Sequence, residues 1–195
     1  MNIHRDPLCG RNFEYFSEDP LLSGLCAAAD VRGVQRHPKA GACIKHFFAN
    51  NQEDNRMSVN EHIGEQALRE IYLRNFAETI AAGDPECLMT SYNLVNGIHT
   101  ANSYDAITAF AREESGFSGY VMTDWSTSSA RITAQVSRPD AYYPCASSAE
   151  CIRAGNDLQM PGTQENIDDI VDAVQNGTLP LGYLQRCALR ILRAL

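Results

Sequence analysis

The sequence has no block of basic residues, no long apolar run, no internal repeat and no low-complexity tract. Its 16 Lys and Arg against 24 Asp and Glu give a net charge of −8, so we expect neither nucleic acid nor an anionic membrane as a partner. No apolar stretch approaches the ~20 residues that a membrane-spanning helix requires. With 195 residues and 44% apolar content, the chain is expected to form one domain with its own hydrophobic core.

The seven cysteines are scattered, odd in number and without a Cys-x-x-Cys pair, which disfavours zinc and a complete disulfide framework. We expect most of them to be small core residues of a reduced protein, with Cys145 and Cys151 close enough in sequence to pair as an alternative. The N-terminus, MNIHRDPLCGRN, lacks the apolar core of a signal peptide. These features favour a cytoplasmic location, and a secreted parent protein is the alternative.

Short apolar runs alternate with amphipathic segments along the chain. The runs predict strands at Gly41–Phe48, Glu86–Tyr92 and Gly119–Thr123, with weaker candidates at Ala154–Met160 and Met1–His4. One helix is predicted to start after the N-cap Asp19 and to end at Gln35, and another to start at a capping box of Ser58 and Glu61 and to end near Gly83. Further helices are predicted at Ser103–Glu114, Ser147–Arg153, Gln164–Gln175 and Leu181–Leu195. This alternation predicts a parallel sheet of βα units. A closed eight-stranded (β/α) barrel typically takes about 250 residues, so we expect an open α/β domain or a truncated barrel.

Polar side chains collect where the three main predicted strands end. Lys45 and His46 end the first, Tyr92 the second, and Asp124 and Trp125 the third. The carboxyl ends of parallel strands form the active face of α/β proteins, so this pattern predicts a site there. Each residue also has a structural explanation: Asp124 as the N-cap of the next helix, Trp125 as core, or Lys45 and His46 as a surface pair.

Five motifs occur in an order that resembles glycoside hydrolase family 3, and together they span nearly the whole chain. They are GRNFEYFSEDPLLSG (10–24), KHFFANNQEDNR (45–56), MTSYNLVNG (89–97), GFSGYVMTDW (116–125) and AGNDLQMPG (154–162). The resemblance implies that residues 1–195 are the central and C-terminal part of that family's TIM-type (β/α)8 barrel domain, truncated at its N-terminal end. The α/β sandwich domain that usually follows the barrel is not expected within this chain.

The resemblance also implies a retaining, exo-acting β-glycosidase with Asp124 as the catalytic nucleophile. Its carboxylate would form a covalent glycosyl-enzyme that water releases with retained configuration. We expect Lys45 or an arginine to keep this carboxylate ionised, and Trp125 to offer a flat apolar face to a sugar ring. The other residues implied to contact the substrate are Arg11, Lys45, His46 and Arg56, which would bind sugar hydroxyls, and Met89 and Tyr92, which would flank the nucleophile.

The family's acid/base is usually a glutamate of the sandwich domain, and no residue of this chain matches it. The acid/base is therefore unassigned, and we expect the isolated chain to be weakly active or inactive. The sequence after Lys45-His46-Phe47 lacks the Pro-Gly-His-Gly of the N-acetylglucosaminidase branch, so we expect a β-linked glucoside or oligosaccharide as substrate. A β-xyloside or an arabinoside is the alternative. No cofactor or metal is implied.

Two other functions compete with this prediction. The chain is either an enzyme fragment or a non-catalytic remnant, with a sugar-binding or structural role and inherited motifs. A Schiff-base aldolase using Lys45 is disfavoured, because no glycine-rich phosphate-binding loop follows the later strands. An open barrel would also expose strand edges, so self-association of the chain is a further expectation.

Overall fold

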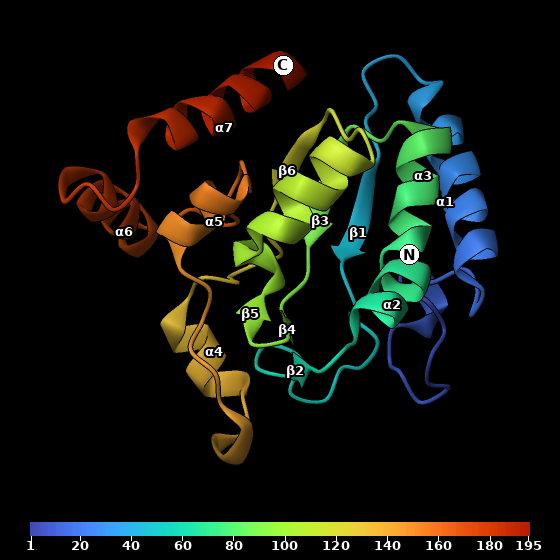
Figure 1. Ribbon diagram of the computed structural model, residues 1–195, viewed down its shortest axis with the longest axis horizontal. Coiled ribbons are helices and arrows are strands. Elements are labelled where there is room, and N and C mark those ends of the chain that lie inside the picture. Colours follow the sequence, from blue (N-terminus) through green and yellow to red (C-terminus); the bar gives the residue numbers. More distant parts are fainter.

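A three-stranded parallel sheet forms the centre of the computed structural model, which describes residues 1–195. Its strands are β1 (Cys43–Phe47), β3 (Cys87–Thr90) and β6 (Tyr120–Met122), in the order β1-β3-β6 (Figure 1). The pairing matches Cys43 with Cys87 and Leu88 with Val121, and a register shift interrupts β1 after Ile44. All three main strands predicted from the sequence are present, within slightly narrower bounds, and the α/β class with a parallel sheet is confirmed.

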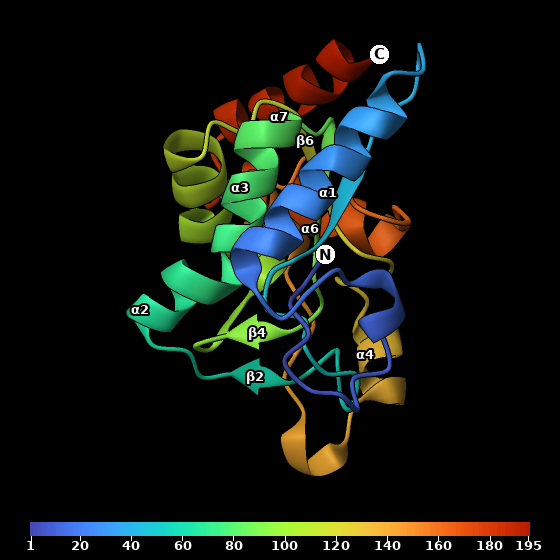
Figure 2. The same cartoon turned by 90° about the vertical axis from the view of Figure 1, so that its right-hand side faces the viewer.

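Helices follow the strands and cover the sheet. Helices α1 (Pro20–Gln35) and α3 (Arg74–Gly83) lie side by side (Figure 2). The π-helical segment η4 (Asp105–Glu114) precedes β6, and three helices complete the C-terminal third: α5 (Ser148–Ala154), α6 (Gln164–Gln175) and α7 (Leu181–Ala194). No helix combines the length and the apolar character needed to cross a membrane.

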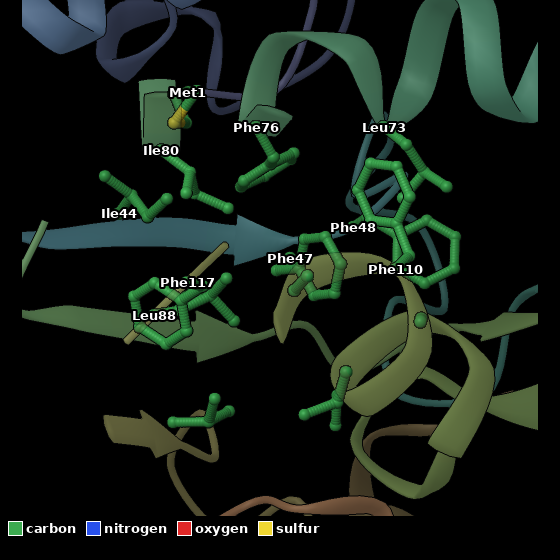
Figure 3. Packing of buried hydrophobic residues seen from close by; sticks show 14 of the residues in the cluster. Met1, Ile44, Phe47, Phe48, Leu73, Phe76, Ile80, Leu88, Phe110 and Phe117 are labelled. Atoms are coloured by element: carbon green, nitrogen blue, oxygen red, sulfur yellow. The ribbon is translucent and has the colours of Figure 1, made fainter. Parts of the chain in front are cut away.

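The main core lies between the sheet and the helices that pack on it. Phe47, at the end of β1, is fully buried, and its ring contacts Phe76 edge-on with centroids 4.9 Å apart. Phe48 and Phe110 extend this aromatic group, with centroids 5.1 and 6.5 Å from Phe47 (Figure 3). These rings anchor the carboxyl end of β1, which is the end that carries the site residues Lys45 and His46.

One predicted helix start is wrong. The capping box at Ser58 and Glu61 does not form; instead β2 (Asn60–Glu61) pairs in parallel with β4 (Leu94–Val95). The Ser58 hydroxyl is hydrogen-bonded to Ser137 instead. The helical segment begins at α2 (Glu65–Ala67), continues through the π-helical η2 (Leu68–Tyr72) and ends with α3 as predicted. Tertiary pairing with a distant strand therefore overrides a local capping signal.

The sequence reading missed a hairpin and a short helix. Strands β4 and β5 (Ile98–His99) are antiparallel and joined by Asn96-Gly97, both with positive φ, as a tight two-residue turn requires. The missed helix is α4 (Ala130–Val136); the 3-10 segments are η1 (Asn12–Glu14), η3 (Thr100–Asn102) and η5 (Pro139–Ala141).

The two weaker strand predictions fail for different reasons. Residues 154–160 make only one bridge, from Leu158 to Met122 on β6. Residues 1–4 form no strand, because the Asn2 side chain takes the place of a backbone ladder. It accepts a hydrogen bond from the His46 N–H and donates one to the His46 carbonyl oxygen, at 3.0 and 2.9 Å.

Candidate active site

Asp124 lies just beyond the carboxyl end of β6, with only 6% of its surface exposed. Its Oδ1 accepts a hydrogen bond from the Trp125 backbone N–H at 2.7 Å, and its carbonyl oxygen accepts one from the Thr127 hydroxyl at 2.8 Å. It does not cap the next helix, because Ser129 performs that role for α4. A buried carboxylate with one oxygen left for another partner suits a reactive group better than a structural cap.

His46 is the partner of that second carboxylate oxygen. Its Nε2 lies 3.5 Å from Asp124 Oδ2, and the imidazole is 2% exposed. Burial, reinforced by the positive charges of Arg11 and Lys45, lowers the pKa of His46 to about 2. The imidazole is therefore neutral, so its contact with Asp124 is not an ion pair.

A cluster of alternating charges begins next to this pair. The Glu14 carboxylate accepts from Arg11 Nε at 2.5 Å and pairs with Lys45 Nζ at 3.3 Å. Although burial opposes it, these two cations hold the pKa of Glu14 below its usual range. Neither Lys45 nor an arginine forms the expected ion pair with Asp124, and Lys45 pairs with Glu14 instead.

The same cluster continues through Glu53. Its carboxylate accepts a hydrogen bond from Arg56 Nη1 at 3.0 Å and lies 4.0 Å from Arg11 Nε. The Arg56 guanidinium stacks over the Tyr92 ring, 4.9 Å from the ring centroid. The Tyr92 hydroxyl in turn donates to the Trp125 carbonyl oxygen at 2.8 Å. Cationic and aromatic side chains from four separate segments thus meet in one contiguous network.

Trp125 and Met89 complete the set of predicted site residues. The Trp125 residue is 59% exposed, which excludes it from the core and leaves its ring accessible to a ligand. Met89 is half-buried on β3 and pairs in register with Met122. The fold therefore gathers the predicted residues at the carboxyl ends of the strands, although Met89 makes no polar contact with the network.

A second buried aspartate provides a contrast with Asp124. The Asp157 side chain is fully buried, and it accepts hydrogen bonds from Arg112 Nη2 at 2.6 Å, from Arg190 Nη1 at 3.0 Å and from the Val121 N–H at 2.8 Å. With both oxygens saturated by fixed donors, it ties α7 and η4 to β6. Its role is structural, whereas Asp124 contacts no arginine or lysine.

Asp124 borders none of the five main cavities. The cavity beside Glu14 and Lys45 holds about 210 Å³, and the largest, of about 530 Å³, lies between residues 52–62 and 138–143. No group of three or more His, Cys, Asp or Glu side chains is arranged to hold a metal ion.

Sequence reasoning missed Glu14 and Glu53. Both lie within the motifs that carry Arg11, Lys45 and Arg56. Glu14 is three residues after Arg11, and Glu53 is three residues before Arg56. That i, i+3 spacing of opposite charges is a signal that would have located them. Glu14 and Glu53 each contact cations from two different segments of the chain, and Glu14 makes the shorter pair of contacts.

Comparisons with known proteins identify the family of this chain. Residues 1–194 match the model described as "Glycosyl hydrolase family 3 N terminal domain". A β-glucosidase of Ruminococcus albus is 43% identical over 194 residues, covering 98% of this chain and 20% of that enzyme. An exo-alpha-(1->6)-L-arabinopyranosidase of Bifidobacterium breve is 39% identical over 188 residues, covering 96% of this chain and 22% of that enzyme.

A solved structure extends the agreement to three dimensions. The structure of β-glucosidase 3B from Thermotoga neapolitana in complex with glucose superposes with a TM-score of 0.87 at 43% identity, covering 100% of this chain and 26% of that one. The chain thus spans about a fifth of the length of the curated relatives it matches. By its sequence and its fold, the chain belongs to glycosyl hydrolase family 3.

Proposed function

We propose that this chain carries the nucleophile of a retaining, exo-acting β-glycosidase that removes terminal glucosyl residues, with Asp124 as that nucleophile. The observation that carries the proposal is the buried Asp124 carboxylate at the end of β6, held 3.5 Å from a neutral His46. The names of the relatives, mostly β-glucosidases, support the sugar. The exposed Trp125 ring supports a sugar-binding face beside the carboxylate.

In the proposed reaction an Asp124 oxygen attacks the anomeric carbon as the bond to the aglycone oxygen breaks with its electron pair. Water then attacks the glycosyl ester and releases the sugar with retained configuration. His46 would bind a sugar hydroxyl without adding charge. Arg11, Lys45 and Arg56 would donate to other hydroxyls, contacts that can strengthen in the oxocarbenium-like transition state.

The proton donor for the leaving group is assigned to no residue of this chain. Glu14 and Glu53, the two carboxylates of the charge network, are both held in ion pairs with Arg11, Lys45 or Arg56. Such pairs stabilise the ionised form, which is unsuited to donate a proton. We therefore expect this chain alone to be weak on natural disaccharides, since general acid assistance typically contributes about 10²–10⁴-fold.

We further infer that residues 1–195 are one part of a TIM-type (β/α)8 barrel domain. Three parallel strands in sequential order, each followed by helical structure, support this placement, as does the bridge that continues the sheet from Met122 to Leu158. In such a barrel the carboxyl strand ends form the active face. Neighbouring strands of the barrel would then surround Asp124.

A second substrate class has its own support. Relatives named exo-alpha-(1->6)-L-arabinopyranosidase are 39% identical to this chain. An α-L-arabinopyranoside lacks the exocyclic hydroxymethyl group of a glucoside and differs from it in the orientation of one ring hydroxyl, so contacts to the other ring hydroxyls would serve both sugars. The alternative of a non-catalytic sugar-binding remnant predicts ligand binding without any covalent intermediate.

The test is covalent trapping with a 2-fluoro-glucoside that carries a dinitrophenolate leaving group. This leaving group needs no proton, and the fluorine slows hydrolysis of the intermediate, so the missing acid does not matter. We expect the intact mass to rise by one fluoroglucosyl group, located on Asp124 by peptide mapping. A folded chain that forms no adduct, or that is labelled on another residue, would contradict the proposal.

Two variants control this experiment. Asp124→Asn should remove the adduct, and Asp105→Asn, which changes an exposed aspartate on η4, should keep it. The corresponding 2-fluoro-arabinopyranoside, used in parallel, compares the two sugars by their initial labelling rates. Faster labelling by the arabinopyranoside would reassign the substrate and leave the nucleophile unchanged.

We also propose that the chain self-associates through its open sheet edge. Strands β1 and β6 are the two edge strands of the sheet. Asn2 covers the backbone of His46 on β1, and beside this strand lies a cavity lined by Phe16, Val31, Val34 and Ile44. Unpaired edges next to apolar surface favour pairing with another chain. Light scattering should show dimers or larger species, and a monodisperse monomer with a cooperative melting transition would count against this proposal.

A further inference from the structure

We propose that Cys43 and Cys87 form an oxidation site, a thiol pair that hydroperoxides convert to an intramolecular disulfide. The two residues are register partners at the first positions of the parallel neighbours β1 and β3. Their sulfur atoms lie 3.0 Å apart, with Cys43 Sγ donating to Cys87 Sγ. The seven cysteines are all free thiols, and this is the only pair joined by a hydrogen bond.

The geometry of the strands suits this bond. Neighbouring strands lie about 4.8 Å apart, which falls within the ~4.4–6.8 Å between Cα atoms that a disulfide spans. The two sulfurs need to approach by about 1 Å to reach the ~2.05 Å bond length. The pair is therefore preorganised by the sheet, whereas Cys145 and Cys151, six positions apart in sequence, share no hydrogen bond.

The two thiols have different surroundings, which assigns their roles. Cys43 is exposed and can meet a dissolved oxidant, whereas Cys87 is buried. The hydrogen bond from Cys43 and burial raise the pKa of the Cys87 thiol, so Cys87 is a poor first nucleophile. Cys43 is thus the residue that the oxidant reaches, and Cys87 is the residue that resolves the product.

The reaction proceeds in two balanced steps. The Cys43 sulfur attacks hydrogen peroxide, the O–O bond breaks, and the products are a Cys43 sulfenic acid and water. The Cys87 sulfur then attacks the Cys43 sulfur, the S–O bond breaks, and the departing hydroxide takes the Cys87 proton to form a second water. The peroxide is reduced by two electrons and the two thiols are oxidised by two.

The disulfide would join the amino-terminal ends of the two strands, at the opposite end of the sheet from Asp124. It would link residues 44 positions apart in sequence, so the unfolded chain would lose much freedom. We expect the thermal unfolding midpoint to rise by about 10 °C, and reduction to reverse the change.

Peptide mapping after treatment of the folded chain with hydrogen peroxide tests the proposal. Cleavage after Lys and Arg places the two cysteines in separate peptides, Ala40–Lys45 and Asn75–Arg112, each with no other cysteine. We expect these two peptides to be linked, with the loss of about 2 Da from the pair of thiols. Mapping also separates this change from methionine oxidation elsewhere.

A matched pair of variants sharpens the test. Cys43→Ser should abolish the cross-link, and Cys26→Ser, at another exposed cysteine, should leave it unchanged. In urea, where the sheet is lost, the preference for this pair should disappear. A Cys145–Cys151 link, dimers joined through Cys26, or a sulfinic acid on Cys43 without any cross-link would each overturn the proposal. The mapping of the unsubstituted chain does not depend on any variant folding.

Discussion

His46 Nε2 lies 3.5 Å from Asp124 Oδ2 even though β3 separates the strands that carry the two residues. The contact spans the sheet at its carboxyl edge and buries both side chains. His46 Nδ1 has no hydrogen-bond partner, so the imidazole depends on Asp124 and on its backbone contacts with Asn2 for its orientation. The protonation state of this pair therefore links the site to the stability of the fold.

The first prediction concerns pH. The pKa of His46 is about 2 in the folded chain and near 6.5 when unfolded. Between these pH values only the unfolded chain binds a proton at His46. The free energy of unfolding therefore has its full value above about pH 6.5 and decreases by up to about 1.4 kcal/mol for each pH unit below that value. Urea denaturation at pH 7, 6 and 5 should show this loss in the original chain and a smaller one in His46→Asn.

An exposed histidine provides the control for that experiment. His37→Asn should leave the pH dependence of the original chain unchanged, because His37 is exposed. Nitrogen NMR of the His46 ring gives a direct check, and the ring should remain neutral at pH 5. A His46 titration midpoint near 6.5 in the folded chain would disprove the assignment of a neutral imidazole.

The second prediction concerns Glu14, which holds Arg11 and Lys45 together. Glu14→Gln should slow the labelling of Asp124 by the 2-fluoro-glucoside by about 10- to 100-fold, because misplaced substrate-binding groups lower the fraction of reactive complexes. Glu113→Gln, on an exposed surface of η4, should label at the original rate. An unchanged rate for Glu14→Gln would mean that the cations need no carboxylate to position them.

The third prediction concerns the buried ion-pair network of Asp157. Asp157→Asn should lower the free energy of unfolding by about 3–5 kcal/mol, because it leaves the buried Arg112 charge without compensation. Arg190→Gln should cost less, since Arg190 is more exposed and Arg112 still pairs with Asp157. Urea denaturation at pH 7 measures both, and equal losses would contradict the stated order.

The fourth prediction uses two glycines of α1. A Cβ at Gly24 would lie 2.9 Å from the Asn75 carbonyl oxygen on α3 and 2.6 Å from Glu78 Cβ, whereas a Cβ at Gly33 would meet nothing within 4 Å. Gly24→Ala should therefore destabilise the fold by about 1–3 kcal/mol. Gly33→Ala should stabilise it by about 0.5–1 kcal/mol through helix propensity. Thermal melts of the two variants should move in opposite directions.

Sequence signals predicted an element correctly where its hydrogen bonds join residues that are close in sequence. Asp19-Pro20 predicted the start of α1 correctly, because the Asp19 side chain accepts hydrogen bonds from the N–H groups of Leu21 and Leu22 within one turn. The capping signal at Ser58 failed, because the partner of Asn60–Glu61 lies more than thirty residues away in β4. Local hydrogen bonds can be read from spacing, whereas pairings between distant segments cannot.

By itself, the sequence determined the α/β class, the three main strands and the family, since strand periodicity, capping residues and ordered motifs are local properties. It also placed Asp124, Lys45 and His46 at strand ends. Only the tertiary structure decided which charges meet. Lys45 pairs with Glu14 instead of Asp124, and Asp157 forms ion pairs with Arg112 and Arg190. These partners lie far apart in the sequence, and Coulomb attraction depends on their distance in space.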